Sequence, residues 1–319
     1  EGALELEFNA SKTGILLQST VVALVPILAL SAGLAAAFQY FGNTSFKTAL
    51  TNAIPFAVIS SAIAIPSVQR LGKQQREFVT YETSLSDIFG VILFNFVTLN
   101  DEVSAGSFGY FVVELVITLF ITIVATLALA FLLAKSKHPI KFLPIIIMVV
   151  LVYAVTKLYH LPGLIFILLF GLFLGNVQEL SQFSLIQKLQ PETLHKEVHK
   201  FTELTKEIAF LVRSSFFLLF GFLIKTEELL DTSTMLWAVG VVAGIFAIRA
   251  LTLLVCKQKL FPILFVAPRG LITILLFLSI PLEQSVSVAN NSLVIQVIAI
   301  TAFIMMFGLM GAKTAVEKT

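Results

Sequence analysis

Long apolar runs recur from one end of the chain to the other, and they limit its possible folds more than any other feature. Residues 112–134, VVELVITLFITIVATLALAFLLA, contain one charged residue, Glu114. About 20 apolar residues in a helix cross the roughly 30 Å hydrocarbon core of a bilayer, whereas the strands of a membrane barrel alternate apolar and polar residues over about ten. Because these runs are continuous and longer, the sequence predicts an all-α polytopic membrane protein.

Composition agrees with this fold class and excludes several classes of function. The chain of 319 residues is 58% hydrophobic and 13% charged, and its net charge of +2 gives no reason to expect nucleic-acid binding. The sequence has no Gly-rich phosphate loop, catalytic triad or cysteine metal pattern, so we expect neither an enzyme nor a cofactor. His195 and His199 have a spacing that suits a metal but no third ligand, and the single Cys256 cannot form an internal disulfide.

Ten membrane spans are predicted. Their approximate ranges are 11–41, 47–69, 78–99, 109–134, 142–159, 162–176, 206–224, 233–255, 261–281 and 292–312. The loops after the second, fourth, sixth and eighth spans carry Lys and Arg, whereas those after the third, seventh and ninth carry almost none. Since basic residues accumulate in cytoplasmic loops, both ends of this chain are predicted to be cytoplasmic. The long connection 177–205 is predicted to be an amphipathic helix at the cytoplasmic surface.

Two spans contain helix-breaking residues in mid-run. They are Pro55, Ser60, Ser61 and Pro66 in 47–69, and Pro268, Arg269 and Gly270 in 261–281. Proline removes a backbone donor and clashes with the preceding turn, so each span should be kinked or unwound. Two interrupted spans of opposite orientation are typical of inverted-repeat transporters, in which the ion site lies where the breaks meet. Ordinary proline kinks in two unrelated helices are the alternative.

Two carboxylates lie inside the span 78–99, where an unpaired charge costs about 2.5–3.5 kcal/mol. Glu82 and Asp87 are five residues apart, about 140° around a helix, and therefore face different neighbours. Thr83 and Ser84 share the face of Asp87 and can offer hydroxyl oxygens. Oxygen ligands with one carboxylate suit a small cation, and the same carboxylate could carry a proton. The alternative is that Asp87 only hydrogen-bonds to a neighbouring helix.

Three arginines are the other charges for which we predict a role inside the spans. Arg249 lies at a depth compatible with that of Glu82, so we expect an ion pair that braces two helices. Arg213 could neutralise Asp87 or the carbonyl end of a helix. Arg269 lies at the second break, where its guanidinium could satisfy carbonyls freed by the unwound turn.

These residues resemble those of the monovalent cation:proton antiporters, especially the NhaP-like branch of sodium/proton exchangers. The family's sixth helix carries Glu-Ser-x-x-Asn-Asp, which is similar to ETSLSD at residues 82–87. By this resemblance the family's exchange carboxylate corresponds to Asp87, and the Arg that pairs with its Glu corresponds to Arg249. The family's Arg-Gly in a broken twelfth helix matches residues 269–270, and a basic residue before a Phe-rich run on the tenth helix matches Arg213.

The chain departs from the family pattern at the unwound fifth helix. The family's Thr-Asp-Pro aligns with Ala64, Ile65 and Pro66, so the second acid is absent. The neutral ligands that the resemblance implies around Asp87 are Thr83, Ser86, the carbonyl of Ala64 and the hydroxyl of Ser67. With a single unpaired acid, the resemblance implies exchange of one cation for one proton.

The resemblance also implies the architecture and the setting. We expect one cation/proton exchanger domain over 1–319 with an NhaA-like inverted-repeat fold and two broken, crossing helices. Within it, 11–99 would be the remainder of the first repeat, 100–141 a linker helix and 142–312 the second repeat. The opening EGALELEFNASKTG resembles the tail of the family's third helix and the connection to its fourth, so we expect the family's first two to three helices to be missing. The partners implied are Na⁺, with K⁺ or Li⁺ as alternatives, H⁺, the lipid bilayer of a bacterial inner membrane and, in the full-length protein, a second copy.

Two other classes of function stay open at this point. One is a symporter for an organic anion on a related inverted-repeat fold, in which Arg213 or Arg269 would bind the substrate carboxylate. The other is a membrane sensor without transport, in which Asp87 only packs against its neighbours.

Overall fold

The computed structural model describes residue 4 and residues 13–100, 105–135, 142–158, 163–182, 187 and 191–316. Helices and their connections account for all of these residues, and no strand occurs among them, which confirms the predicted all-α class. They fall into two compact units, each described by itself. The first comprises Glu1–Thr13 and Glu102–Ser214, and the second comprises Gly14–Asp101 and Ser215–Thr319. The predicted repeat boundaries stay a prediction.

Five helical segments in the described ranges are long and apolar enough to cross a membrane. They are Thr13–Gly42, Phe46–Ser67, Phe111–Leu133, Thr232–Val255 and Asn291–Ala312. Each coincides with a predicted span, and Phe142–Thr156 is a shorter apolar helix at a sixth. The polytopic character is therefore confirmed by length and composition, while the count of ten spans stays a prediction.

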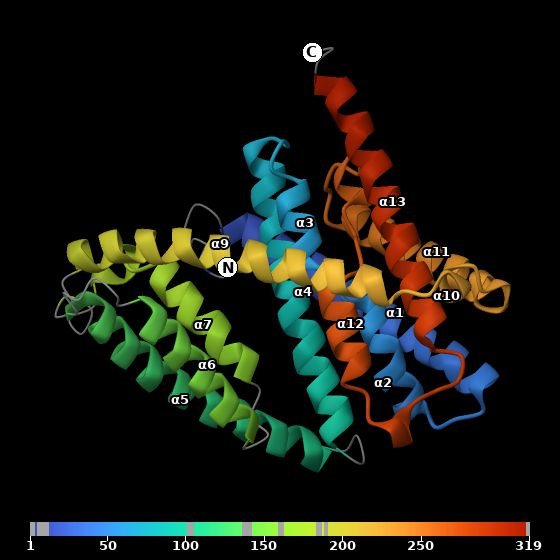
Figure 1. The fold of residues 1–319 in the computed structure, drawn as a ribbon, viewed down its shortest axis with the longest axis horizontal. Helices are drawn as coiled ribbons and strands as arrows, with labels where there is room; N and C mark the ends of the chain where they lie inside the picture. The colour runs from blue at the N-terminus through green and yellow to red at the C-terminus, as the bar shows by residue number, and fades with distance from the viewer. Residues whose placement is uncertain are drawn as a thin grey trace. The chain divides into compact units, whose positions relative to one another are not determined.

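The first unit is a group of helices around an apolar core. Its elements are α5 (Ala105–Lys135), α6 (Phe142–Leu158), α7 (Gly163–Gly175), η3 (Glu179–Gln182) and the N-terminal part of α9 (Pro191–Leu223). Helices α5, α6 and α7 lie side by side, shown in green in Figure 1. Their core contains Leu129, Ile145, Phe166 and Phe170, and Phe201 of α9 packs against it.

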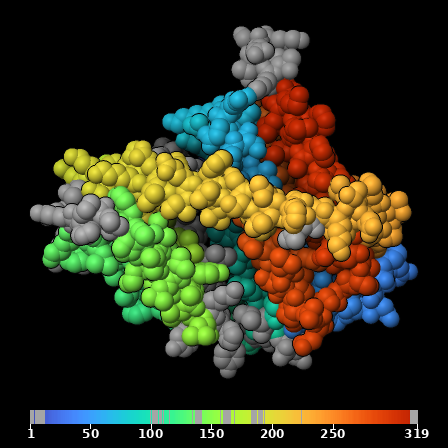
Figure 2. Space-filling view, in the orientation of Figure 1, coloured from blue at the N-terminus to red at the C-terminus, as the bar shows by residue number. Residues whose placement is uncertain are grey.

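The described parts of the predicted amphipathic segment 177–205 include η3 and the start of α9, and residues 183–186 and 188–190 of that prediction lie outside the described residues. Leu194 and Val198 are buried, whereas His195 and Lys196 are exposed, and Figure 2 shows this part of α9 in yellow. Helix α9 continues without interruption to Leu223, so the described end of the amphipathic segment and the predicted span from about residue 206 belong to one helix, and the residue at which the span begins stays a prediction. Residues 192–220 contain neither Gly nor Pro, so no helix-breaking residue interrupts α9 where the two predicted elements join.

The second unit contains every other described helix. Its elements are α1 (Thr13–Gly42), α2 (Phe46–Ala57), α3 (Ser61–Ser67), α4 (Lys73–Leu99), α10 (Thr226–Leu229), α11 (Thr232–Val255), η4 (Ile263–Phe265), α12 (Leu271–Leu278), η5 (Leu282–Gln284) and α13 (Asn291–Val316). Helix α4 packs against α2, α3 and α12, and α11 packs against α13 and η4 (Figure 1). The main core joins α1, α2, α11 and α13 through side chains that include Phe38, Phe56, Ile245 and Leu293.

Both predicted interruptions are present in this unit. Helix α2 ends at Ala57 and α3 begins at Ser61, and residues 266–270, which belong to no helix, connect η4 to α12. The first interruption lies earlier than the alignment with Ala64–Pro66 predicted. Ala64 is inside α3, where its carbonyl oxygen accepts a hydrogen bond from the backbone N–H of Val68 at 3.2 Å. Pro55 lies inside α2 and Pro66 inside α3, and the break falls between these helices, just before Ser61.

Candidate functional site

The two interruptions meet each other. The backbone N–H of Ser60 donates to the carbonyl oxygen of Pro268 at 2.9 Å, so the broken segments are joined directly. Gly270 permits the approach, because a Cβ atom there would lie 2.5 Å from Ile63 Cδ1 and 3.1 Å from Ser60 Oγ. A larger residue at position 270 would therefore displace the end of the Ile63 side chain and crowd the Ser60 hydroxyl.

Arg269 holds the end of α2 at this crossing. Its Nε donates to the carbonyl of Phe56 at 2.6 Å, and a terminal nitrogen donates to that of Ala57 at 3.3 Å. The other terminal nitrogen donates to Ala267 at 3.2 Å, and the side chain is only 2% exposed. The last carbonyls of a helix lack partners and carry its negative dipole end, so a buried guanidinium stabilises them. Arg269 thus compensates carbonyls of the other broken segment as well as its own.

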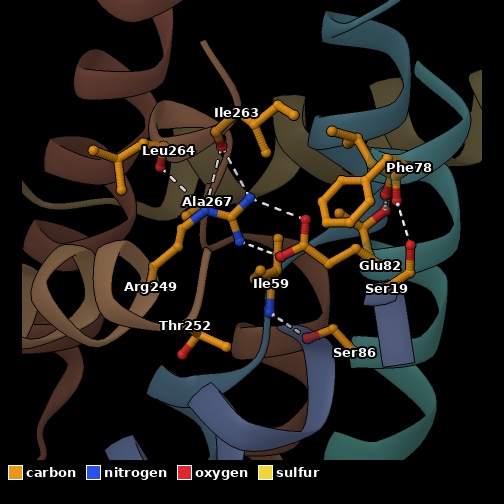
Figure 3. A network of polar contacts seen from close by, with 12 residues as sticks. Ser19, Ile59, Phe78, Glu82, Ser86, Arg249, Thr252, Ile263, Leu264 and Ala267 are labelled. Carbon is orange, nitrogen blue, oxygen red and sulfur yellow. Dashed lines mark hydrogen bonds and ion pairs between the residues drawn. The ribbon is translucent and has the colours of Figure 1, made fainter. Parts of the chain in front are cut away.

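Glu82 and Arg249 form a buried ion pair, shown in Figure 3. One terminal nitrogen of Arg249 contacts Glu82 Oε1 and the other donates to Oε2 at 3.0 Å, so the pair is bidentate. The same guanidinium donates to the carbonyls of Ile263, at 3.0 Å, and Leu264, at 3.1 Å. Glu82 is fully buried. This network joins α4, α11 and η4, and it occupies both oxygens of the carboxylate.

Asp87 is surrounded differently. The Ser61 hydroxyl donates to Oδ2 of Asp87, and the backbone N–H of Ser61 also faces this carboxylate. The other oxygen, Oδ1, is buried and has no hydrogen-bond partner within the described ranges, and the same holds for the hydroxyls of Ser60 and Ser84. An unpartnered buried acceptor costs about 1–3 kcal/mol or more when charged. A site with such oxygens is suited to taking up a proton or a cation.

Sequence reasoning did not identify Ser61 as the neighbour of Asp87. The signal was the Ser60–Ser61 pair between two prolines, since hydroxyl residues in a broken helix can serve a buried acid that has no other donor.

The other predicted neutral ligands have their polar groups engaged. The Ser86 hydroxyl accepts a hydrogen bond from the backbone N–H of Ile59 at 3.0 Å and so holds the first break (Figure 3). The Thr83 hydroxyl donates to the Val79 carbonyl at 2.8 Å. In α3, the Ser67 hydroxyl donates to the carbonyl of Ile63 at 2.7 Å.

Two further predicted features lie in the first unit. Arg213 is half-buried in α9, and its compensating role toward Asp87 stays a prediction. His195 and His199 are exposed, and His199 lies 3.6 Å from Glu203. Over the described part of the chain, no group of three or more His, Cys, Asp or Glu could hold a metal ion.

Comparison with known proteins adds two likenesses to this geometry. A family model described as sodium/hydrogen exchanger, transmembrane, matches residues 4–315. Among solved structures, the sodium proton antiporter MjNhaP1 from Methanocaldococcus jannaschii at pH 8 is similar with a TM-score of 0.64 and 13% sequence identity, over 97% of this chain and 79% of that chain. At this identity the likeness shows the fold. No curated protein matches the sequence.

Proposed function

The chain belongs to the sodium/hydrogen exchanger family, and we propose that it exchanges one monovalent cation for one proton across the membrane. As a member it is a multi-pass membrane protein of a cation:proton antiport family. The proposed cation is Na⁺, with K⁺ and Li⁺ as the alternatives to be compared with it.

The observation that carries this proposal is the environment of Asp87. Of the two acids inside the predicted span of α4, Glu82 is fully buried and Asp87 is half-buried, and among the described residues only Glu82 of these two has a basic partner. Beside the first break, Asp87 has a hydroxyl on one oxygen, and its second oxygen has no partner among the residues that the structure describes. Asp87 is therefore the acid to which we assign the transported ion, and Glu82 with Arg249 is the brace that holds its helix in place.

The proposed coupling follows from charge. Asp87 is neutral when it carries a proton, and it forms a neutral pair when it binds a monovalent cation. An unloaded carboxylate would carry its charge through the low-dielectric interior, which costs several kcal/mol. The loaded forms therefore cross between the two open states more readily than the empty form, and each turnover exchanges one positive charge for another. Movement of the broken segments as one body would supply the alternating access.

Some predicted ligands stay in the proposed site and others leave it. Thr83 and Ser86 keep lone pairs on their hydroxyl oxygens, so they remain candidates for neutral ligands. The carbonyl of Ala64 already accepts the N–H of Val68 within α3, so we do not assign it to the cation, whereas the Ser67 hydroxyl donates to Ile63 as Thr83 does to Val79 and stays a candidate. Arg269 donates to three carbonyls, which disfavours the alternative of an organic-anion symporter that uses it as a substrate ligand.

The setting is part of the proposal. Alternation of basic loops supports cytoplasmic ends for this chain, and the family resemblance supports a bacterial inner membrane and a homodimer.

Exchange in vesicles tests the proposal. The full-length protein is reconstituted with a pH-sensitive dye inside, a pH gradient is imposed, and Na⁺, K⁺ or Li⁺ is added. We expect a cation to dissipate the gradient without a change in membrane potential, and we expect Asp87→Asn to remove the response. Proton movement that needs none of these cations, or that persists unchanged in Asp87→Asn, would contradict antiport. Anion uptake that survives Asp87→Asn would instead support the symporter.

A further inference from the structure

We propose that Ser61 is a switching ligand of the exchange site. Its hydroxyl donates to Asp87 while no cation is bound, and it turns its oxygen toward the cation when one arrives. This inference rests on the proposed function and deepens it, because it names a residue of the first break that sets the affinity for the cation. Alignment had left this position without a role.

The backbone places the Ser61 hydroxyl with little freedom. Ser61 is the first residue of α3, and both residues before it are tied to other segments. The N–H of Ile59 donates to the Ser86 hydroxyl at 3.0 Å, and the N–H of Ser60 donates to Pro268 at 2.9 Å. The break therefore presents Ser61 to Asp87 from a fixed position.

The hydroxyl can serve both states of the site. A serine hydroxyl has one donor hydrogen and two acceptor lone pairs, and rotation about one bond exchanges them. Its hydrogen suits the negative Oδ2 of Asp87, where it lies in this structure. A cation bound at the carboxylate would repel that hydrogen, so rotation would replace it with a lone pair. Hard cations prefer such oxygen ligands in place of their water.

Two more oxygens are available on the same side. Oδ1 of Asp87 and the hydroxyl of Ser84 are both buried without partners in the described ranges. Ser84 lies three residues before Asp87 and therefore shares its helix face. With the Ser61 oxygen, these groups give a site with one negative charge and neutral hydroxyls contributed from both α3 and α4, as a monovalent cation requires.

A purely structural role for Ser61 predicts different behaviour. If its hydroxyl only joined α3 to α4, its removal would lower the stability of the protein and leave the cation concentration at half-maximal rate unchanged. A ligand role predicts that the cation concentration at half-maximal rate rises while the maximal rate stays unchanged. The reason is that loss of binding common to the ground and transition states raises KM and leaves kcat unchanged.

The test measures Na⁺-driven exchange in vesicles for wild type, Ser61→Ala, Ser61→Thr and Ser31→Ala. Loss of one ligand in Ser61→Ala should raise the half-saturating Na⁺ concentration about tenfold while the maximal rate stays within about twofold. Ser61→Thr keeps a hydroxyl and should stay near wild type. Ser31 is the matched control, a buried serine of α1 with no hydroxyl partner among the described residues, and its alanine variant should leave both values unchanged.

The outcomes separate this inference from the proposed function. An unchanged half-saturating concentration in Ser61→Ala, with Asp87→Asn inactive, overturns the ligand role and leaves antiport standing. Full exchange by Asp87→Asn overturns antiport itself. If Ser61→Ala shows no exchange at all, the Na⁺-dependent rise in its melting temperature decides. If the melting temperature of Ser61→Ala rises only at about tenfold higher Na⁺ than that of wild type, the ligand role is supported. If it rises at the same Na⁺ concentration as that of wild type, the ligand role is overturned.

Discussion

Glu82 and Asp87 lie five residues apart on one helix, but the hydrogen-bond partners of their carboxylate oxygens differ. Glu82 has both oxygens on Arg249, whose remaining donors bind backbone carbonyls. Asp87 has a neutral hydroxyl on one oxygen and nothing on the other within the described residues. The difference teaches that burial alone does not identify the exchanging acid. The acid with unsatisfied oxygens is the one that can gain from an ion.

The comparison also separates stability from activity. A buried ion pair adds little net stability, but removal of one partner leaves a buried charge and costs about 3–5 kcal/mol. A carboxylate without a basic partner is already in that unfavourable condition. Neutralising Glu82's partner should therefore damage the fold, whereas neutralising Asp87 should damage only transport.

The largest effect is expected for Asp87→Asn. The amide keeps the size of the side chain but can neither bind a proton nor balance a cation, so exchange in vesicles should fall to the level of empty vesicles. The melting temperature in detergent should equal or exceed that of wild type, because a buried charge without a basic partner has been removed. A large drop in melting temperature would mean that Asp87, like Glu82, serves the fold.

Arg249→Met tests the other half of the comparison. The substitution leaves the fully buried Glu82 without its basic partner and should lower the free energy of unfolding by about 3–5 kcal/mol. Denaturant unfolding in detergent measures this loss. The double variant Glu82→Gln/Arg249→Met should recover a substantial part of it, since no charge is then stranded. If the double variant is no more stable than the single one, the contacts of Arg249 with Ile263 and Leu264 dominate instead.

Arg269→Met asks whether a buried arginine without a carboxylate behaves like a paired one. The substitution frees the carbonyls of Phe56 and Ala57 at the end of α2, and we expect a loss of about 1–3 kcal/mol. Arg269→Lys keeps the charge but lacks the planar fork, so it should recover only part of the loss. A loss as large as that of Arg249→Met would show that the charge of Arg269, rather than its hydrogen bonds, is what the fold depends on.

Local sequence rules predicted one part of the candidate site well. Helical phase separated the two acids, and depth within the spans predicted the pairing of Glu82 with Arg249, which the structure contains. Breaker residues likewise predicted two interruptions. These features depend only on spacing along a chain whose spans are recognisable, so a single sequence is enough for them.

The position of the first break could not be predicted in the same way. Pro66 is the stronger local signal, yet α3 includes it, whereas the interruption falls just before Ser61. The difference lies in distant partners, because Pro268 and Ser86 bind the N–H groups of the break and Arg269 binds the freed carbonyls. Such partners lie far away in the sequence. The same limitation concealed Ser61, whose role depends on where the chain leaves the helix.

The smallest expected effect concerns Asp231, which provides a reference for the Ser61–Asp87 contact outside the membrane-spanning residues. Asp231 is the N-cap of α11, and its Oδ1 accepts hydrogen bonds from the Ser233 hydroxyl at 2.6 Å and the Ser233 N–H at 2.9 Å. These bonds, the hydroxyl bond first, hold the pKa of Asp231 below its ordinary value of 3.8. Here a hydroxyl stabilises a carboxylate that solvent also reaches.

A lowered pKa in the folded state means that the unfolded state binds the proton more readily. The stabilising contribution of Asp231 is therefore complete at neutral pH and is lost as the pH falls through the ordinary value toward the lower folded one. Asp231→Ala should have a slightly lower melting temperature than wild type at pH 7. The difference between the two melting temperatures should narrow on acidification below about pH 4. Asp231→Asn keeps an acceptor oxygen without the charge, so its melting temperature should lie closer to that of wild type at pH 7, and this smaller difference should also narrow in acid because only wild type loses a charge there. If the difference in melting temperature between wild type and Asp231→Ala stays constant into acid, the cap does not depend on the charge of the carboxylate. Asp231 would then no longer support the view that the Ser61 hydroxyl prefers a charged Asp87.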